Sequence, residues 1–127
     1  MEEQLRALLL ADNTVAGRVA TRIDFGTRPQ GSALPSIVMN TISDLDDYIL
    51  AARSGHSEAR VQIDCYAHSY GAAKLLSRDV RGLLSGYRGG IFKGVFHEGQ
   101  RDSREGGSNE PDRPHRVSMD YLVQFSN

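Results

Sequence analysis

The chain has 127 residues, of which 39% are hydrophobic and 24% are charged, and its formal net charge at pH 7 is -1. These values fit one globular domain, residues 1–127, with a single modest core, and they exclude disordered, collagen-like and coiled-coil classes. Acidic and basic residues are interspersed, which disfavours extended binding to free nucleic acid because such binding usually needs a broad positive field.

The cysteine content and the N-terminal residues indicate the compartment. Cys65 is the only cysteine, so no disulfide can form within the chain and nothing marks an oxidising environment. Glu2 and Glu3 stand where a signal peptide would carry Lys or Arg, and no segment approaches the roughly 20 apolar residues of a membrane span. We therefore expect a protein that is made in a cytoplasm, stays soluble there and has no membrane partner.

The N-terminal third predicts short elements. Leu5, Leu8 and Leu9 share one face of a helix, and Asp12 or Asn13 is placed to cap a second short turn. Composition and alternation predict the segments that follow. In chain order we expect a helix, a short helical turn, a strand over 21–25, a loop over 26–35 and a strand over 36–43.

The clearest periodic signal lies in the middle of the chain. Apolar and polar residues alternate from Glu58 to Ala67, which indicates a half-buried strand. Ser69 is then placed to cap a helix from about Tyr70 to Tyr87, and a glycine-rich stretch from Gly86 onward ends it. The polar side of this helix carries Lys74, Arg78 and Arg81.

The C-terminal part predicts two strands, Ile91 to Glu98 and Arg116 to Phe125, that form a hairpin. Between them, Arg101 to Pro114 has no apolar residue and high charge, so it cannot bury enough surface to offset its ordering entropy, and we expect a mobile loop over 101–114. The elements together predict an α+β fold, an antiparallel sheet of about four strands with an N-terminal helix and one long central helix packed on one face.

Two groups of residues contain side chains that can bind metal ions, but neither group forms a complete metal site. Asp44, Asp46 and Asp47 lack the glycine and distant glutamate of a calcium loop, so a solvated turn is the better interpretation. Cys65 and His68 have the Cys-x-x-His spacing of half a zinc site, and a complete site needs two more ligands. The alternation of the strand places Cys65 on its apolar side, which favours a buried structural thiol. We assign no metal, no cofactor and no catalytic residue.

One enzymatic alternative stays open. Asp64, Glu98 and Asp120 are placed to line one open sheet face, where three carboxylates can hold metal ions for phosphodiester cleavage. Outward charges on solvated strands produce the same pattern without any function. A small metal-dependent nuclease that uses these three residues is therefore the rival hypothesis.

Several segments carry a likeness in their order and spacing, although no single one is diagnostic. They are Leu5 to Leu9 with Gly17 and Arg22–Ile23 behind it, Pro29 to Gly31, Leu34 to Val38, Arg60 to Ala67, Glu98 to Asp102 and Arg116 to Tyr121. Together they cover most of the chain, which resembles the tail-completion, or tail-terminator, proteins of long-tailed phages and gene transfer agents.

This resemblance implies a structural virion protein with helices packed on an antiparallel sheet and no catalytic residue. Its relatives are understood to form a hexameric ring on the tail tube, which halts tube polymerisation and presents the surface that meets the head connector. The implied partners are further copies of the chain, the tail tube protein and the head-tail connector protein. The implied location is the head-proximal end of the tail, after assembly in the host cytoplasm, and the source particle is left open between phage, prophage remnant and transfer agent. A connector or stopper adaptor is the alternative.

The polar segment that follows residue 100 is the part that we expect to contact a neighbouring subunit. Arg101, Asp102, Arg104 and Glu105 carry alternating charge, which suits specific pairing across an interface. An unstructured insert without a partner is the competing interpretation of the same residues.

Overall fold

The computed structural model describes residues 1–29, 33–46, 56–104 and 114–126, with the backbone alone at 43–46 and 56. Its elements are α1 (Glu2–Ala11), α2 (Asn13–Val19), β1 (Ile23–Phe25), β2 (Ser36–Asp46), β3 (His56–Ala67), α4 (Tyr70–Leu84), β4 (Phe92–Arg104) and β5 (His115–Ser126). The predicted α+β class is confirmed, but the sheet has five strands and not about four. No helix of the described residues is long and apolar enough to cross a membrane.

The strand order in the sheet is β1-β2-β3-β5-β4. All neighbouring pairs are antiparallel except β1 and β2, which run parallel in a register that pairs Ile23 with Ile37. The expectation of a wholly antiparallel sheet is therefore wrong at this edge. The physical reason is that β2 begins beside the first residue of β1, with Ile37 next to Ile23. The two strands therefore run in the same direction.

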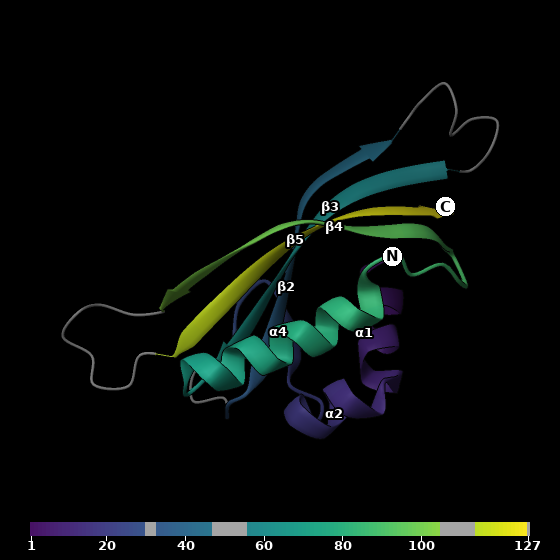
Figure 1. The fold of residues 1–127 in the computed structure, drawn as a ribbon. Coiled ribbons are helices and arrows are strands. Elements are labelled where there is room, and N and C mark those ends of the chain that lie inside the picture. The colour runs from purple at the N-terminus through teal and green to yellow at the C-terminus, as the bar shows by residue number, and fades with distance from the viewer. Residues whose placement is uncertain (30–32, 47–55, 105–113, 127) are drawn as a thin grey trace.

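The three helices lie on one face of the sheet and enclose the core with it (Figure 1). The alternation predicted for β3 and β5 is confirmed, because the apolar residues of both strands are buried on this face. From β3 they are Ala59, Val61, Ile63, Cys65 and Ala67, from β5 Val117, Met119, Tyr121, Val123 and Phe125, and α4 adds Ala73, Leu76, Val80 and Leu84. Among the described residues no helix lies over the second face, which we call the open face.

Local signals set the helix boundaries. Asp12 caps α2 by accepting a hydrogen bond from the Thr14 N–H at 2.9 Å, and Ser69 caps α4 by accepting one from the Ala72 N–H at 3.1 Å. The long helix ends at Leu84, three residues before the predicted end. Gly86 explains this, since its φ of +78° turns the chain toward β4 and its N–H donates to the Val95 carbonyl at 2.7 Å.

Strand β4 is longer and less regular than predicted. It continues through Arg104, with Asp102 opposite Val117, so the expected loop is wrong for 101–104, and 105–113 lie outside the described residues. A complete ladder with β5 stabilises this polar stretch, which has few apolar groups of its own to bury. Register shifts add one residue at Lys93 and one at Glu98.

Candidate functional site

The residues predicted to contact a neighbouring subunit do not form one loop. Arg101, Asp102 and Arg104 lie on β4, and Glu105 lies outside the described residues. Successive strand residues point to opposite faces, so Arg101 lies on the open face and Asp102 faces α4. The pleat of the strand therefore divides the predicted contact residues between two surfaces.

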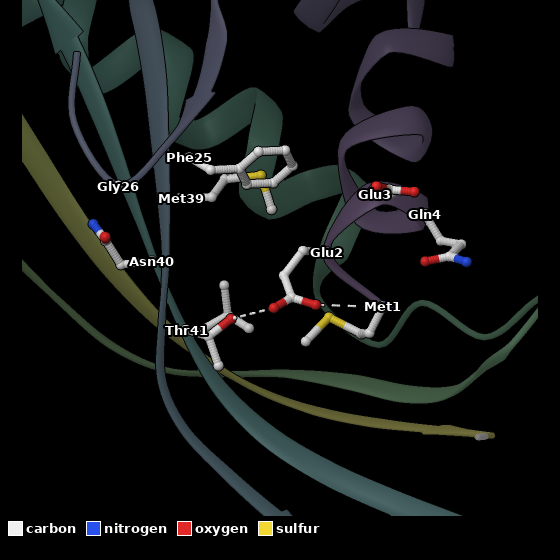
Figure 2. Close-up of a pocket in the computed structure, with 10 residues that line it drawn as sticks. Met1, Glu2, Glu3, Gln4, Phe25, Gly26, Met39, Asn40 and Thr41 are labelled. Atoms are coloured by element: carbon white, nitrogen blue, oxygen red, sulfur yellow. Dashed lines mark hydrogen bonds and ion pairs between the residues drawn. The ribbon is translucent and has the colours of Figure 1, made fainter.

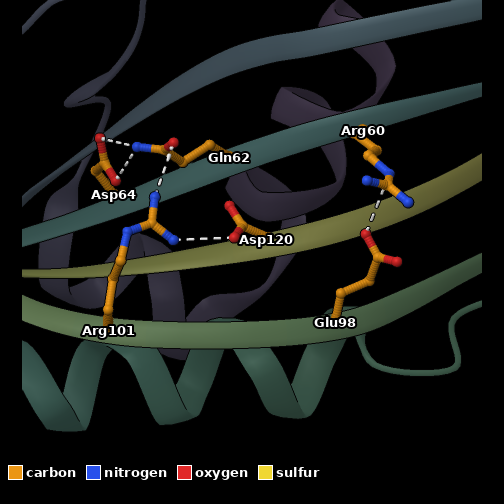
Figure 3. Close-up of polar contacts among 6 residues, drawn as sticks. All are labelled: Arg60, Gln62, Asp64, Glu98, Arg101 and Asp120. Atoms are coloured by element: carbon orange, nitrogen blue, oxygen red, sulfur yellow. Dashed lines mark hydrogen bonds and ion pairs between the residues drawn. The ribbon is translucent and has the colours of Figure 1, made fainter.

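A polar network centred on Arg101 lies on the open face (Figure 3). The Arg101 guanidinium donates to Asp120 Oδ2 at 2.9 Å and to Gln62 Oε1 at 3.1 Å. Gln62 Nε2 in turn donates to both carboxylate oxygens of Asp64, at 2.9 and 3.1 Å. The network joins β4, β5 and β3, so these side chains hold one another in place across the sheet.

A shallow hollow of about 440 Å³ adjoins this network. Its lining includes Ile42, Arg60, Gln62, Glu98, Arg101 and Asp120. Arg60 Nε lies 3.6 Å from Glu98 Oε1, and Ile42 is 58% exposed because it is the extra residue where the register of β2 shifts. Charged pairs and an exposed apolar side chain thus stand next to each other on the open face.

The three carboxylates of the nuclease hypothesis do not converge on a common point. Each one has its own partner within the chain: Gln62 for Asp64, Arg60 for Glu98 and Arg101 for Asp120. In the part of the chain that the structure describes, no group of three or more His, Cys, Asp or Glu side chains could hold a metal ion together. The arrangement therefore offers no support for two-metal phosphodiester chemistry.

The other groupings singled out in the sequence are explained by the fold. Cys65 is buried on the core face, where burial raises the pKa of its thiol, and His68 is exposed. The interpretation of Cys65 as a structural thiol is consistent with this position. Asp44 and Asp46 do not form the expected turn, because they continue β2 opposite Ala59 and Ser57, while Asp47 lies outside the described residues.

A second polar surface lies between α4 and the edge strand β4. Lys74 Nζ lies 2.8 Å from Asp102 Oδ1, and the Tyr70 hydroxyl donates to Asp102 Oδ2 at 3.2 Å. Lys74 holds the pKa of the Asp102 carboxyl below its usual range, first through this hydrogen bond and then through its charge. These contacts fasten the end of β4 to the start of α4.

Beside this contact is a groove of about 630 Å³, which we call the basic groove. It is lined by Tyr70, Gly71, Lys74, Leu75, Ser77, Arg78, Arg81 and Gln100. Sequence reasoning placed the three cations on the polar side of the helix without recognising a surface there. The missing information was the position of Gln100 and Asp102, which were expected in or next to a loop and instead lie on β4 beside α4.

Within the described residues, both surfaces contain paired polar groups, Arg101 with Asp120 and Lys74 with Asp102, and exposed apolar side chains lie beside them. Neither has a nucleophile next to a base, nor converging carboxylates. The fold defines the class by its architecture, an α+β protein with α1, α2 and α4 packed on one face of a mixed five-stranded sheet.

Residues 3–124 match the family model described as Tail completion protein gp17, and the chain belongs to this family. The resemblance stated from the sequence is thereby confirmed. The chain is a structural protein of the virion tail that takes part in tail completion, and it is not an enzyme.

A solved structure shares the fold. A chain in the structure titled "Virion of native gene transfer agent (GTA) particle" superposes with a TM-score of 0.70, at 16% sequence identity, over 97% of this chain and 92% of that chain. At this identity the similarity concerns the fold. Among curated proteins, none matches the chain.

Proposed function

We propose that copies of this chain close into a ring on the end of the tail tube, six copies as in the relatives that the sequence resembles. The ring stops polymerisation of the tube and forms the surface to which the head is joined. The observation that carries this proposal is the family match over residues 3–124, because it includes residues of every described helix and every described strand. The shared fold with a chain of a gene transfer agent particle supports it.

The partners in this proposal are other copies of the chain, the tail tube protein and the head-tail connector protein. A ring uses head-to-tail contacts, in which two different patches of each subunit meet, and rotation closes the circle. A specific contact of this kind buries on the order of 1,000 Å² or more. Because subunit association depends on concentration, a ring assembled on a tube need not persist among free subunits, and a monomer in solution is compatible with the proposal.

The contact role of Arg101, Asp102, Arg104 and Glu105 remains a prediction within this proposal. Arg101 and Asp102 also have partners inside the chain, Asp120 and Lys74. Charge reversal at Arg101 therefore disturbs the open face as well as any interface, so loss of assembly in such a variant is informative only when the free energy of unfolding is measured alongside it.

Electron microscopy of particles whose gene for this chain is deleted tests the proposal. We expect tails of irregular and excessive length that lack heads, because nothing ends tube growth or offers a joining surface. Restoring the gene on a plasmid is the control and should return tails to a uniform length. Tails of normal length without attached heads would contradict the capping role and would indicate an adaptor at the head-tail junction.

A further inference from the structure

We infer that adjacent copies in the ring meet through two different flanks of the chain, the basic groove of one copy against an acidic flank at α1 and β1 of the next. The acidic flank comprises Glu2, Glu3, Phe25 and Thr41 with the hollow between them. This inference rests on the proposed ring and names the surfaces that would build it.

The basic groove has positive charge that is not neutralised within the described chain. Lys74 is paired with Asp102, but neither the Arg78 nor the Arg81 side chain forms a hydrogen bond or ion pair with another described residue, and both residues are exposed. The single carboxylate of α4, Asp79, points to the other side of the helix and pairs with a residue of α2. Two guanidinium groups that no described residue neutralises therefore suit an acidic partner.

Exposed apolar groups line the same groove and indicate a protein partner. Leu75 is 47% exposed and Tyr70 is 52% exposed, both on the outer side of α4. A phosphate backbone is bound by a longer row of cations with no need for an aliphatic side chain. Two free arginines beside a leucine and a tyrosine instead fit the composition of a protein interface, where arginine and aromatic residues are enriched.

The acidic flank lies around a hollow of about 570 Å³ (Figure 2). The Glu2 carboxylate accepts a hydrogen bond from Thr41 Oγ1 at 3.2 Å and lies 3.6 Å from the Met1 amino group. Its pKa is lowered, chiefly by a hydrogen bond from its own backbone, so the group is ionised at neutral pH. Glu3 is exposed, and its side chain makes no ion pair or hydrogen bond with another described residue.

The acidic flank also carries an exposed aromatic ring. Phe25, on β1, is 47% exposed and borders the hollow together with Met39 (Figure 2). Glu2 and Glu3 suit the start of α1 for a local reason, since the helix dipole favours negative charge there. The helix dipole does not explain why an exposed phenylalanine and a hollow lie next to the two glutamates. A partner with basic and apolar side chains explains all of these features.

The positions of the two flanks fit a head-to-tail contact. One lies at the β1 edge of the sheet and the other at the β4 edge, which are the opposite ends of the strand order. Charge and apolar surface are complementary, with Arg78 and Arg81 facing two glutamates while Leu75 meets the hollow beside Phe25. Contact through side chains also agrees with β4, whose register shifts hinder direct addition of a strand from another chain.

A charge swap inside one chain tests the inference. Arg78→Glu with Arg81→Glu, and separately Glu2→Lys with Glu3→Lys, should each lose control of tail length, as the gene deletion does. The chain with all four changes should regain normal tails, since every interface then carries the reversed pair. Arg78→Lys with Arg81→Lys keeps the charge and should behave as the unchanged chain. Circular dichroism and thermal unfolding show that each variant is folded.

Normal tail length in the Arg78→Glu, Arg81→Glu variant would overturn the inference. So would failure of the fourfold variant to restore length while it is folded. Tails of normal length that no longer retain DNA would also overturn it and would assign the groove to nucleic acid. Normal tails after gene deletion would instead remove the proposed function itself, so the two failures are distinguishable.

A photo-crosslink gives a measurement that does not depend on a destabilising change. Benzoylphenylalanine placed at Leu75, which is exposed, should link two copies of the chain in assembled tails. Mass spectrometry should place the second end of the link at residues 1–4 or at Phe25. A link to the tail tube protein, or to another part of the neighbouring copy, would overturn the inference.

Discussion

The two faces of the sheet are built from the same strands but are held by different forces. The helix-covered face is filled with apolar side chains such as Ile63 and Leu76, which have no exposed surface. The open face is held by charged and amide groups around Arg101, which is partly exposed. Burial of apolar surface involves no charges that salt can screen, whereas exposed ion pairs weaken as salt is added. The stability of the fold therefore depends mainly on the helix-covered face, so the side chains of the open face can differ without loss of the fold.

The largest expected difference is between neighbouring leucines of α4. Leu76→Ala should lower the free energy of unfolding by about 3 kcal/mol, because it leaves a cavity in the core. Leu75→Ala is the matched control, the same change one residue away at a side chain that is 47% exposed, and should change stability by no more than about 0.5 kcal/mol. Urea denaturation measures both. Equal losses would contradict the assignment of the core to one side of this helix.

A smaller effect is expected on the open face. A double-mutant cycle with Arg101→Met and Asp120→Asn should give a coupling energy of about 0.5 kcal/mol, because the two side chains are 53% and 40% exposed. The coupling should fall as salt is raised, while the cost of Leu76→Ala should not. A coupling that does not respond to salt would place this network in a drier environment than the exposed fractions indicate.

The smallest effect concerns pH and the contact that joins α4 to β4. Because Lys74 lowers the folded-state pKa of Asp102, the contact stabilises the fold above the unfolded-state pKa of aspartate and is lost as pH falls through the lower folded value. Asp102 raises the pKa of Lys74, so at alkaline pH the stabilisation is lost as pH rises through that raised value. Lys74→Met should therefore cost stability near neutral pH and less at acid pH. A constant difference between the two proteins at every pH would contradict this linkage.

The elements that the sequence predicted correctly are those whose signal is local. Strand β3 alternates along its whole length, and α4 begins directly after its cap at Ser69. The end of β4 was not predicted because its residues up to Arg104 are polar. They form a strand because β5, the next strand in the chain, supplies their hydrogen-bond partners, which the local pattern of β4 does not show. The direction of β1 is likewise a tertiary property, since three residues carry no information about which neighbour they join.

The surfaces were less predictable than the fold because they depend on register. Alternation placed Asp64 and Asp120 on one face, as observed, but it could not show that Gln62 and Arg101 would tie them to the chain. Residues 94–97 lie between the two register shifts. Each of them, Val95 included, therefore points to the face opposite to the one that a regular strand starting at Phe92 would give it. Asp64 is also only 3% exposed, although an outward position on a solvated strand predicts exposure.

The extra residues Lys93 and Glu98 in β4 also affect the protein before any tail exists. A host cell makes many copies of a structural subunit ahead of assembly, and a long, flat sheet edge in such a store would seed cross-β fibres. An edge that is interrupted twice, each time at a charged residue, cannot pair along its length with the strand of another copy. The two interruptions therefore lower the tendency of free subunits to form fibres before they join a tail.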